Sequence, residues 1–225
     1  MTTAATTGNL RDGVTGIVLA GGRSSRFGSD KLAAEIDGTT VLERAITAVA
    51  VVASEVIVAG QPAGRTPAIP ETSIRMLPDA EPSGGPLRAL AGVLSRVPGE
   101  GVPADVAIVV AGDMPSLVPD VLGLLVATVR ASADTDAAVL GDPRDPSRLQ
   151  PLPAALRVGP ARAAAASALD AGDRSLVRLL GRLAVVEIPV ERWQTIDPEA
   201  QTLVDVDVPG DLRRMDGGAR DQRMR

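Results

Sequence analysis

The chain contains no histidine, no cysteine and no tyrosine. These absences exclude thiolate nucleophiles, Ser-His-Asp relays, zinc sites built on Cys or His, and disulfide scaffolds. Any reaction that the protein carries out must depend on carboxylates, lysine, arginine, hydroxyl groups, backbone amides and a hard metal ion. With one Phe and one Trp in 225 residues, the chain also lacks the aromatic platforms that bind single-stranded nucleic acid.

Positive charge and long apolar runs are also scarce. The formal net charge is −5, whereas a nucleic-acid or anionic-membrane surface would need a basic face. No apolar run approaches the roughly 20 residues of a membrane helix, and residues 1–11 are polar and threonine-rich rather than signal-like. We therefore expect a cytoplasmic protein with no nucleic-acid or membrane partner, in which a few local cations hold any anionic substrate.

The composition is 45% apolar, which is enough for one sizeable core. Apolar runs alternate with segments of helical period, and clusters of Gly, Pro or Asp separate them. This alternation predicts an α/β fold of three α/β/α layers, with a mostly parallel, Rossmann-like sheet. We expect a single domain over residues 13–215, with flexible tails at residues 1–12 and 216–225.

Apolar runs and turn residues predict the order of elements. The expected strands are residues 14–20, 55–59, 73–77, 106–111, 137–140 and 183–188, with a further strand ending at residue 207. The expected helices are residues 41–52, 86–97, 119–131, 161–169 and 175–180. Thr40 and Glu43 form a capping box before the first helix. A loop rich in Pro, Asp and Arg runs through Ser147, residues 148–160 are assigned to no element, and Trp193 is expected at the edge of the core.

The strongest motif is the loop L-A-G-G-R-S-S-R-F-G-S-D-K of residues 19–31, which follows the first expected strand. Its glycines let backbone amides approach phosphate oxygens, while Arg26 and Lys31 neutralise their charge. The loop differs from the Walker sequence and from the dinucleotide-binding G-x-G-x-x-G pattern. It therefore predicts a triphosphate site of another kind.

Two groups of aspartates are candidates for metal binding. Asp113 follows the expected strand 106–111, at the end where open α/β sheets bind ligands, and a carboxylate there suits Mg²⁺ held against an α-phosphate. Asp205 and Asp207 flank Val206, and strand alternation would send both carboxylates to the same side. Asp207 is the candidate for the second metal contact. The alternative interpretation is that Asp113 caps the turn before Pro115 and that Asp207 is the N-cap of a helix before Pro209.

The loop of residues 19–31 resembles the L-A-G-G-x-S-x-R-x-G-x-D-K loop of the molybdenum cofactor guanylyltransferases, within a larger group of nucleotidyltransferases. The resemblance extends, with gaps, from about residue 13 to residue 215 and implies the nucleotidyltransferase fold. It also implies a role for Asp79, which precedes Gly84-Gly85-Pro86 as an aspartate precedes the family's G-P-L segment. The loop and the resemblance together assign nucleotide binding to Leu19, Ala20, Gly21, Gly22, Lys31, Asp79 and Asp113.

The resemblance implies that GTP is the nucleotide and that molybdopterin carrying molybdenum is the acceptor. The acceptor phosphate would attack the α-phosphorus of GTP in line and release pyrophosphate. No general base is needed because a phosphate monoester is already largely ionised near neutral pH. Arg26 and Lys31 would stabilise the triphosphate, while Asp113 and Asp207 hold Mg²⁺. Family precedent favours a monomer.

Other substrates and classes remain as alternatives. Asp205 and Asp207 stand where many guanylyltransferases of this family carry asparagines, and related cytidylyltransferases carry aspartates there. Gln150-Pro151-Leu152 and the Ala-Gly-Gly of the first loop resemble the guanylyl members instead. The alternatives are a cytidylyltransferase for the same pterin, a guanylyltransferase for a phospholactate-type acceptor, a glycosyltransferase with a D-x-D motif, and a GTP-binding regulator without turnover.

Overall fold

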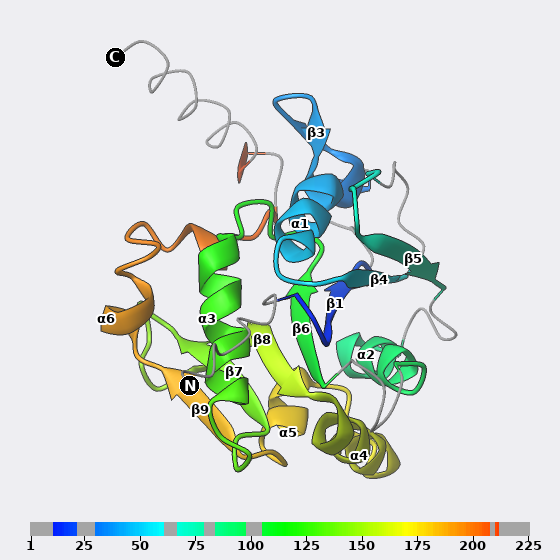
Figure 1. The fold of residues 1–225 in the computed structure, drawn as a ribbon, viewed down its shortest axis with the longest axis vertical. Helices are drawn as coiled ribbons and strands as arrows, with labels where there is room; N and C mark the ends of the chain where they lie inside the picture. The colour runs from blue at the N-terminus through cyan, green and yellow to red at the C-terminus, as the bar shows by residue number, and fades with distance from the viewer. Residues whose placement is uncertain are drawn as a thin grey trace, which may run out of the picture.

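The computed structural model describes residues 11–21, 30–60, 67–78, 84–97, 105–207 and 210–211, and the structural statements below concern these residues. Within them, seven strands form one sheet that lies between helices (Figure 1). In spatial order the strands are β5 (Ser73–Leu77), β4 (Glu55–Ala59), β1 (Val14–Leu19), β6 (Val106–Ala111), β8 (Leu149–Arg157), β7 (Ala137–Gly141) and β9 (Val185–Ile188). A separate hairpin consists of β2 (Glu35–Ile36) and β3 (Thr39–Thr40).

The sheet is mostly parallel, as the sequence predicts. Strands β5, β4, β1 and β6 run in one direction, β7 is parallel to β9, and β8 is antiparallel to β6 and β7. Strands β1 and β6 lie at the centre and are buried on both faces, which explains why their sequences are continuously apolar. The carboxyl ends of the four parallel strands meet at one edge, where open α/β sheets bind ligands.

Helices cover both faces of the sheet and complete the three expected layers. The core on one face includes α1 (Val41–Ala50), α3 (Pro119–Arg130) and α6 (Val190–Trp193). The core on the other face includes α2 (Pro86–Leu94), α4 (Val158–Asp170) and α5 (Leu176–Leu180). Neighbouring residues of β1 alternate between the two cores, so that Val18 packs with α1 and Leu19 with the opposite face.

Helices α1 and α2 begin where the sequence predicts. Thr40 Oγ1 accepts a hydrogen bond from the Glu43 N–H (3.1 Å), and the Glu43 carboxylate accepts one from the Thr40 N–H (2.9 Å). This is the expected capping box. Helix α2 begins at Pro86, directly after Gly85, whose φ of 83° favours glycine.

Strand β8 is not predicted by the sequence. Pro151 and Pro153 stand inside it, and proline has no N–H to donate to a neighbouring strand, so the pattern favours a loop. The structure accommodates both prolines because the regular ladders do not cover them. The register with β7 shifts between Val139 and Gly141, and the ladder with β6 extends only to Ala154.

Two expectations near the C-terminal end are wrong. The expected strand ending at residue 207 is not part of the sheet: a 3-10 helix, η2 (Gln201–Leu203), is followed by residues 204–207 without regular structure. Trp193, expected at the edge of the core, is fully buried and donates its Nε1–H to the Gly141 carbonyl at 3.2 Å. A buried indole needs such an acceptor, and the end of β7 supplies it.

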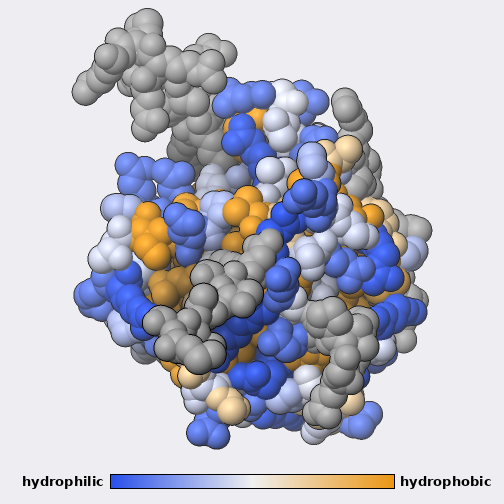
Figure 2. Space-filling model, viewed as in Figure 1, coloured by the Kyte–Doolittle hydropathy of each residue, from blue (hydrophilic) through white to orange (hydrophobic). Residues whose placement is uncertain are grey.

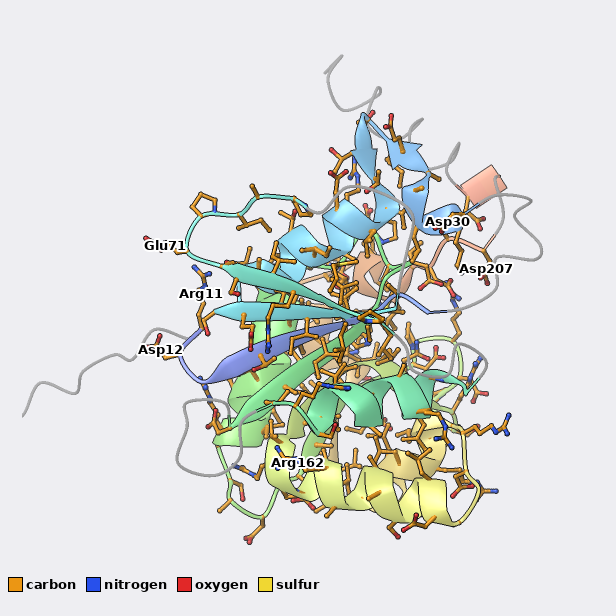
Figure 3. All side chains as sticks on the ribbon, turned by 90° about the vertical axis from the view of Figure 1, so that its right-hand side faces the viewer. Arg11, Asp12, Asp30, Glu71, Arg162 and Asp207 are labelled. Atoms are coloured by element: carbon orange, nitrogen blue, oxygen red, sulfur yellow. The ribbon has the colours of Figure 1, made fainter. Side chains whose placement is uncertain are left out.

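The two expected tails fall mostly outside the described residues. Arg11, which the sequence assigns to the first tail, donates its Nε–H to the Ala53 carbonyl at 3.2 Å. Figure 3 shows Arg11 and Glu71 at one edge of the sheet and Asp30 and Asp207 at the opposite edge. None of the helices in the described part of the chain is long and apolar enough to cross a membrane.

The surface carries apolar side chains in separate places. Figure 2 shows hydrophilic residues over much of one face, with hydrophobic residues in small areas between them. The large hydrophobic residues that are most exposed belong to different parts of the fold: Val51, Met76, Val177, Val186 and Ile196. Scattered apolar residues of this kind are normal for a protein surface.

Candidate active site

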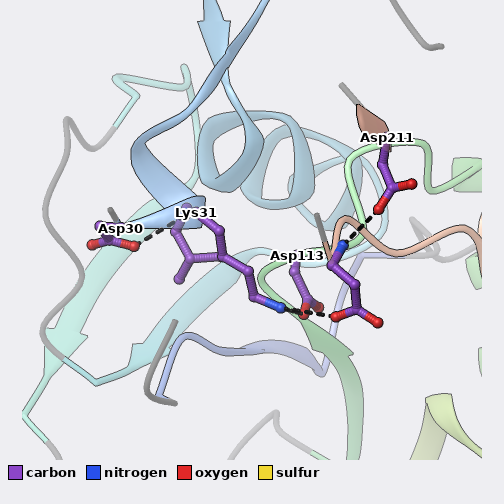
Figure 4. Close-up of polar contacts among 6 residues, drawn as sticks. Asp30, Lys31, Asp113 and Asp211 are labelled. Atoms are coloured by element: carbon purple, nitrogen blue, oxygen red, sulfur yellow. Dashed lines mark hydrogen bonds and ion pairs between the residues drawn. The ribbon is translucent and has the colours of Figure 1, made fainter. Parts of the chain in front are cut away.

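Lys31 begins a short 3-10 helix, η1 (Lys31–Ala33), at the end of the glycine-rich loop. The Asp30 carboxylate caps η1 by accepting a hydrogen bond from the Leu32 N–H at 3.0 Å. Leu32 is buried in the core that includes α1. This anchored turn sends the Lys31 side chain toward the end of β6 (Figure 4).

Asp113 follows the carboxyl end of β6. The Gly112 N–H, one residue earlier, donates a hydrogen bond to the Leu19 carbonyl at 2.9 Å and joins the end of β6 to the end of β1. Asp113 therefore stands close to the start of the glycine-rich loop. Both segments reach the edge of the sheet at which α/β proteins bind ligands.

The side chains of Lys31, Asp113 and Asp207 meet in one ionic cluster, called here the Lys31 cluster. Lys31 Nζ lies 2.5 Å from Asp113 Oδ2 and 3.4 Å from Asp207 Oδ1 (Figure 4). The side chains of Lys31 and Asp113 are only 22% and 20% exposed, whereas that of Asp207 is 67% exposed. The cluster is thus a partly buried ion pair with a second carboxylate on its solvent side.

Residues Asp205–Asp207 form a strap across the end of β6, called here the acidic strap. Val206 is fully buried, and its N–H donates to the Asp113 carbonyl at 2.9 Å. The Asp207 N–H donates to the Asp211 carboxylate at 3.0 Å. Because Val206 faces inward, Asp205 and Asp207 both face solvent. Both carboxylates are thus exposed, without the β-strand that the sequence predicts.

The charges of the cluster shift the pKa values of two groups. Burial lowers the pKa of Lys31, but the hydrogen bond and charge of Asp113 and the charge of Asp207 outweigh it, so the net pKa is raised. Partial burial raises the pKa of Asp205, and the charges of Asp207 and Asp113 raise it further. Lys31 is consequently a full cation at neutral pH, surrounded by more negative than positive charge.

The donor set of the cluster fits a hard divalent cation that also binds phosphate. Among the described residues, no group of three or more acidic side chains is arranged to hold a metal ion. Mg²⁺ usually takes only one or two protein carboxylates and completes its shell with phosphate oxygens and water. Asp113 and Asp207 already share one cation, the Lys31 ammonium. These two carboxylates are therefore the residues that could hold Mg²⁺.

Gly60 supports the start of the glycine-rich loop and is missed by the sequence analysis. The Ala20 N–H donates to the Ala59 carbonyl, and the Gly60 N–H donates to the Leu77 carbonyl, both at 2.8 Å. Gly60 has a φ of 126°, and a Cβ atom there would lie 2.9 Å from the Ala20 carbonyl group. Its glycine identity follows from a close approach between two loops, which a sequence pattern cannot reveal.

The structure brings most of the predicted site residues to one edge of the sheet. Those that lie there are Leu19, Ala20, Gly21, Lys31, Asp113 and Asp207. Leu19 and Ala20 are buried, while Gly21 is exposed. Gly22, Arg26 and Asp79 lie outside the described residues.

A mostly parallel sheet that carries at its carboxyl edge the first residues of a glycine-rich motif, a lysine and two carboxylates is typical of α/β proteins of the nucleotide-binding class. The profile of the MobA-like NTP transferase domain matches residues 16–186, and the chain belongs to this family. Two relatives are named probable molybdenum cofactor guanylyltransferase. The protein from Chloroflexus aggregans is 36% identical over 89% of this chain and 92% of its own length. That from Natronomonas pharaonis is 32% identical over 89% of this chain and 95% of its own length.

Solved structures share the fold. The molybdopterin-guanine dinucleotide biosynthesis protein A of Archaeoglobus fulgidus has a TM-score of 0.69 and 21% identity, over 92% of this chain and 99% of that protein. The 2-C-methyl-D-erythritol 4-phosphate cytidylyltransferase of Thermus thermophilus has a TM-score of 0.59 and 19% identity, over 91% and 98% of the two chains. The fold is thus the nucleotidyltransferase fold that the resemblance implies.

Proposed function

We propose that this protein transfers GMP from GTP to the phosphate of molybdenum-carrying molybdopterin, forming the guanine dinucleotide cofactor and pyrophosphate. The observation that carries the proposal is the Lys31 cluster, in which the last residue of a phosphate-binding type of loop lies 2.5 Å from Asp113 at the carboxyl edge of the sheet. Relatives that are 29% to 36% identical over most of the chain are named probable molybdenum cofactor guanylyltransferase. Their name supports molybdopterin as the acceptor and the guanine dinucleotide as the product.

Lys31 and the loop amides would bind the triphosphate of GTP. The Lys31 ammonium is charged and partly buried, and it is paired with two carboxylates. It therefore keeps its positive charge when phosphate oxygens bind. The backbone of Leu19, Ala20 and Gly21, with Gly22 next to it, would hold the nucleotide. Arg26 would add a second positive charge as the triphosphate becomes pyrophosphate.

Asp113 and Asp207 would hold Mg²⁺, and Asp113 would also contact the nucleotide, as would Asp79. When bound, the metal ion would neutralise charge on the α-phosphate oxygens. The two carboxylates differ in burial, so Asp113 provides a fixed ligand and Asp207 a solvent-facing one. The fixed placement of Asp113 would lower the cost of reorganisation when charge develops.

The chemical step needs alignment more than proton transfer. An oxygen of the acceptor phosphate forms a bond to the α-phosphorus of GTP, and the bond from that phosphorus to the oxygen bridging to the β-phosphate breaks, so that pyrophosphate leaves with the electron pair. The acceptor oxygen is already deprotonated near neutral pH. The absence of histidine from the chain is compatible with this reaction.

Pyrophosphate release tests the proposal. The purified protein is mixed with Mg²⁺ and molybdopterin, and GTP is compared with CTP; phospholactate replaces the acceptor and a nucleotide sugar replaces the donor in parallel reactions. We expect release with GTP and molybdopterin, and loss of release in Asp113→Asn. Faster release with CTP or with phospholactate would overturn the assigned substrate. Sugar transfer without pyrophosphate, or GTP binding without turnover, would overturn the reaction.

We further propose that the enzyme acts as a monomer in the cytoplasm, where GTP is available. The scattered placement of its exposed apolar residues supports a monomer. Sedimentation equilibrium should give the mass of one chain at micromolar concentration. A mass twice that value would overturn this part of the proposal.

A further inference from the structure

A polar cavity of about 170 Å³ borders the acidic strap at Asp205. The connection between β7 and β8 forms one wall, and the segment from Glu199 to Asp205 forms another. Complete ligand pockets usually enclose about 300–1,000 Å³. A cavity of this smaller size fits one of the two substrates of the proposed reaction. The glycine-rich loop would bind the other.

The cavity adjoins the Lys31 cluster through the acidic strap. Asp205 lines the cavity, and only Val206 separates it from Asp207 in the chain. Val206, the next residue, donates its N–H to the Asp113 carbonyl. A ligand in the cavity would therefore lie beside the carboxylates proposed to hold the metal ion.

Two guanidinium groups belong to the lining of the cavity, those of Arg144 and Arg148. In the described part of the chain, neither side chain forms a salt bridge. The Ser147 hydrogen bonds and, to a smaller extent, the charge of Arg148 lower the pKa of the neighbouring Asp145. The turn that carries Arg144 is fixed because its N–H donates to the Asp142 carboxylate at 2.8 Å. Both arginines are exposed, so they are accessible to an anion, for which guanidinium provides a forked pair of donors.

The remaining polar groups of the cavity supply acceptors. The carboxylates of Glu199 and Asp205 accept hydrogen bonds, and the half-buried Gln150 amide both donates and accepts. The Asp142 carboxylate also lines the cavity and accepts from the Arg144 N–H. Anion-binding arginines beside carboxylates suit a ligand that combines phosphate with N–H groups. A nitrogen heterocycle bearing a phosphate monoester has this combination, whereas a small carboxylic acid phosphate such as phospholactate has no N–H to offer.

We infer that this cavity is the acceptor subsite, in which Arg144 and Arg148 bind the anionic groups of the acceptor while Gln150, Glu199 and Asp205 bind the N–H and carbonyl edge of its ring. The inference rests on the proposed function, since it presumes that a phosphate-bearing acceptor is guanylylated at the Lys31 cluster. It assigns specificity for the acceptor to residues that do not bind GTP.

Steady-state kinetics of the full chain tests the assignment. At saturating GTP, the double variant Arg144→Ala, Arg148→Ala should raise the KM for molybdopterin at least tenfold, because a hydrogen bond to a charged group is worth about 1.5–3 kcal/mol and each 1.4 kcal/mol is tenfold. The KM for GTP should stay within twofold. The double Arg→Lys variant should recover part of the loss because it restores the charge.

Arg96→Ala provides the matched control. Arg96 is also an exposed arginine, but it follows α2 and precedes β6, so it lies toward the opposite edge of the sheet. Its side chain donates to the Gly92 carbonyl of its own helix at 2.8 Å. This variant should keep the wild-type KM values for both substrates.

Fluorescence of the single tryptophan gives a readout that does not depend on turnover. Trp193 donates to Gly141, which directly precedes Asp142 of the cavity. Titration with 6-hydroxymethylpterin phosphate should quench this fluorescence saturably in the wild type and in Arg96→Ala. The double alanine variant should need at least tenfold more of the probe.

The outcomes separate the two proposals. An unchanged KM for molybdopterin and an unchanged probe affinity in the double alanine variant would overturn the subsite while leaving the proposed function intact. Saturable probe binding that the double variant weakens, together with no guanylylation of molybdopterin, would support the subsite and overturn the proposed function. No saturable binding of the probe to the wild type would also overturn the subsite.

Discussion

The Lys31 ammonium and the Asp113 carboxylate are separated by 82 residues in the chain and by 2.5 Å in the structure. One belongs to the end of the loop after β1, and the other follows β6. Hydrogen bonding between Gly112 and Leu19 holds these two strand ends together. If the nucleotide binds at Lys31 as proposed, its phosphate oxygens would share this ammonium group with Asp113.

Removal of the Lys31 charge should slow the reaction strongly. We expect Lys31→Ala to lower kcat by about a hundredfold or more, the size of a single electrostatic contribution to catalysis. Lys31→Arg should retain part of the activity because it keeps the charge. Pyrophosphate release measures both variants, and wild-type turnover in Lys31→Ala would exclude the role given to this lysine.

Activity should require a divalent cation held by Asp113 and Asp207. We expect EDTA to abolish pyrophosphate release and excess Mg²⁺ to restore it. Asp207→Asn should increase the Mg²⁺ concentration for half-maximal rate by about tenfold, because one charged ligand is lost. The exposed Asp120 on α3 offers a control, and Asp120→Asn should leave the Mg²⁺ titration unchanged. Full activity in EDTA would rule out the metal site.

Gly60→Ala should damage both stability and nucleotide binding. The added Cβ would lie 2.9 Å from the Ala20 carbonyl group, at a φ of 126°. We expect a loss of about 1–3 kcal/mol in the free energy of unfolding and a higher KM for GTP. Urea denaturation and initial rates measure the two effects.

Gly159→Ala is the control for this glycine. Gly159 lies in α4, and a Cβ atom there would meet no atom within 4 Å. The substitution should leave the KM for GTP unchanged and raise the free energy of unfolding by about 0.5–1 kcal/mol. Equal behaviour of the two alanine variants would contradict the packing argument.

Trp193→Ala should destabilise the protein by about 3–5 kcal/mol, the usual cost of truncating a large buried aromatic residue. The side chain is fully buried and its indole N–H is bonded to Gly141. Trp193→Phe should cost less because most of the volume is retained. Urea denaturation followed by circular dichroism measures both variants, since neither retains tryptophan fluorescence. A loss below 1 kcal/mol in Trp193→Ala would mean that the ring contributes little to the core.

The fold was predictable wherever one local signal decided the structure. Continuous apolar runs mark β1 and β6, and Thr40 with Glu43 marks the start of α1. Strand β8 was not predictable because Pro151 and Pro153 argue against a strand, and only the local interruption of its pairing explains them.

The sequence predicts the residues of the candidate site better than it predicts the residues that pack around the site. Glycines, cations and a carboxylate after a strand identify Lys31 and Asp113, and the structure brings Asp207 to the same cluster although the strand expected to carry it is absent. Gly60 depends on a close approach between two loops. Trp193 depends on an acceptor 52 residues away. Neither relationship leaves a pattern in nearby residues.

The acidic strap has a consequence for how the protein matures during synthesis. Every strand of the seven-stranded sheet in the described residues has been translated once Ile188 has been added, but Asp207 comes later. A nascent chain can therefore assemble its whole scaffold around β1 and β6 while one carboxylate of the Lys31 cluster is still inside the ribosome. If Asp207 holds the metal ion as proposed, we expect fragments that end before the strap to retain the sheet but to lack activity.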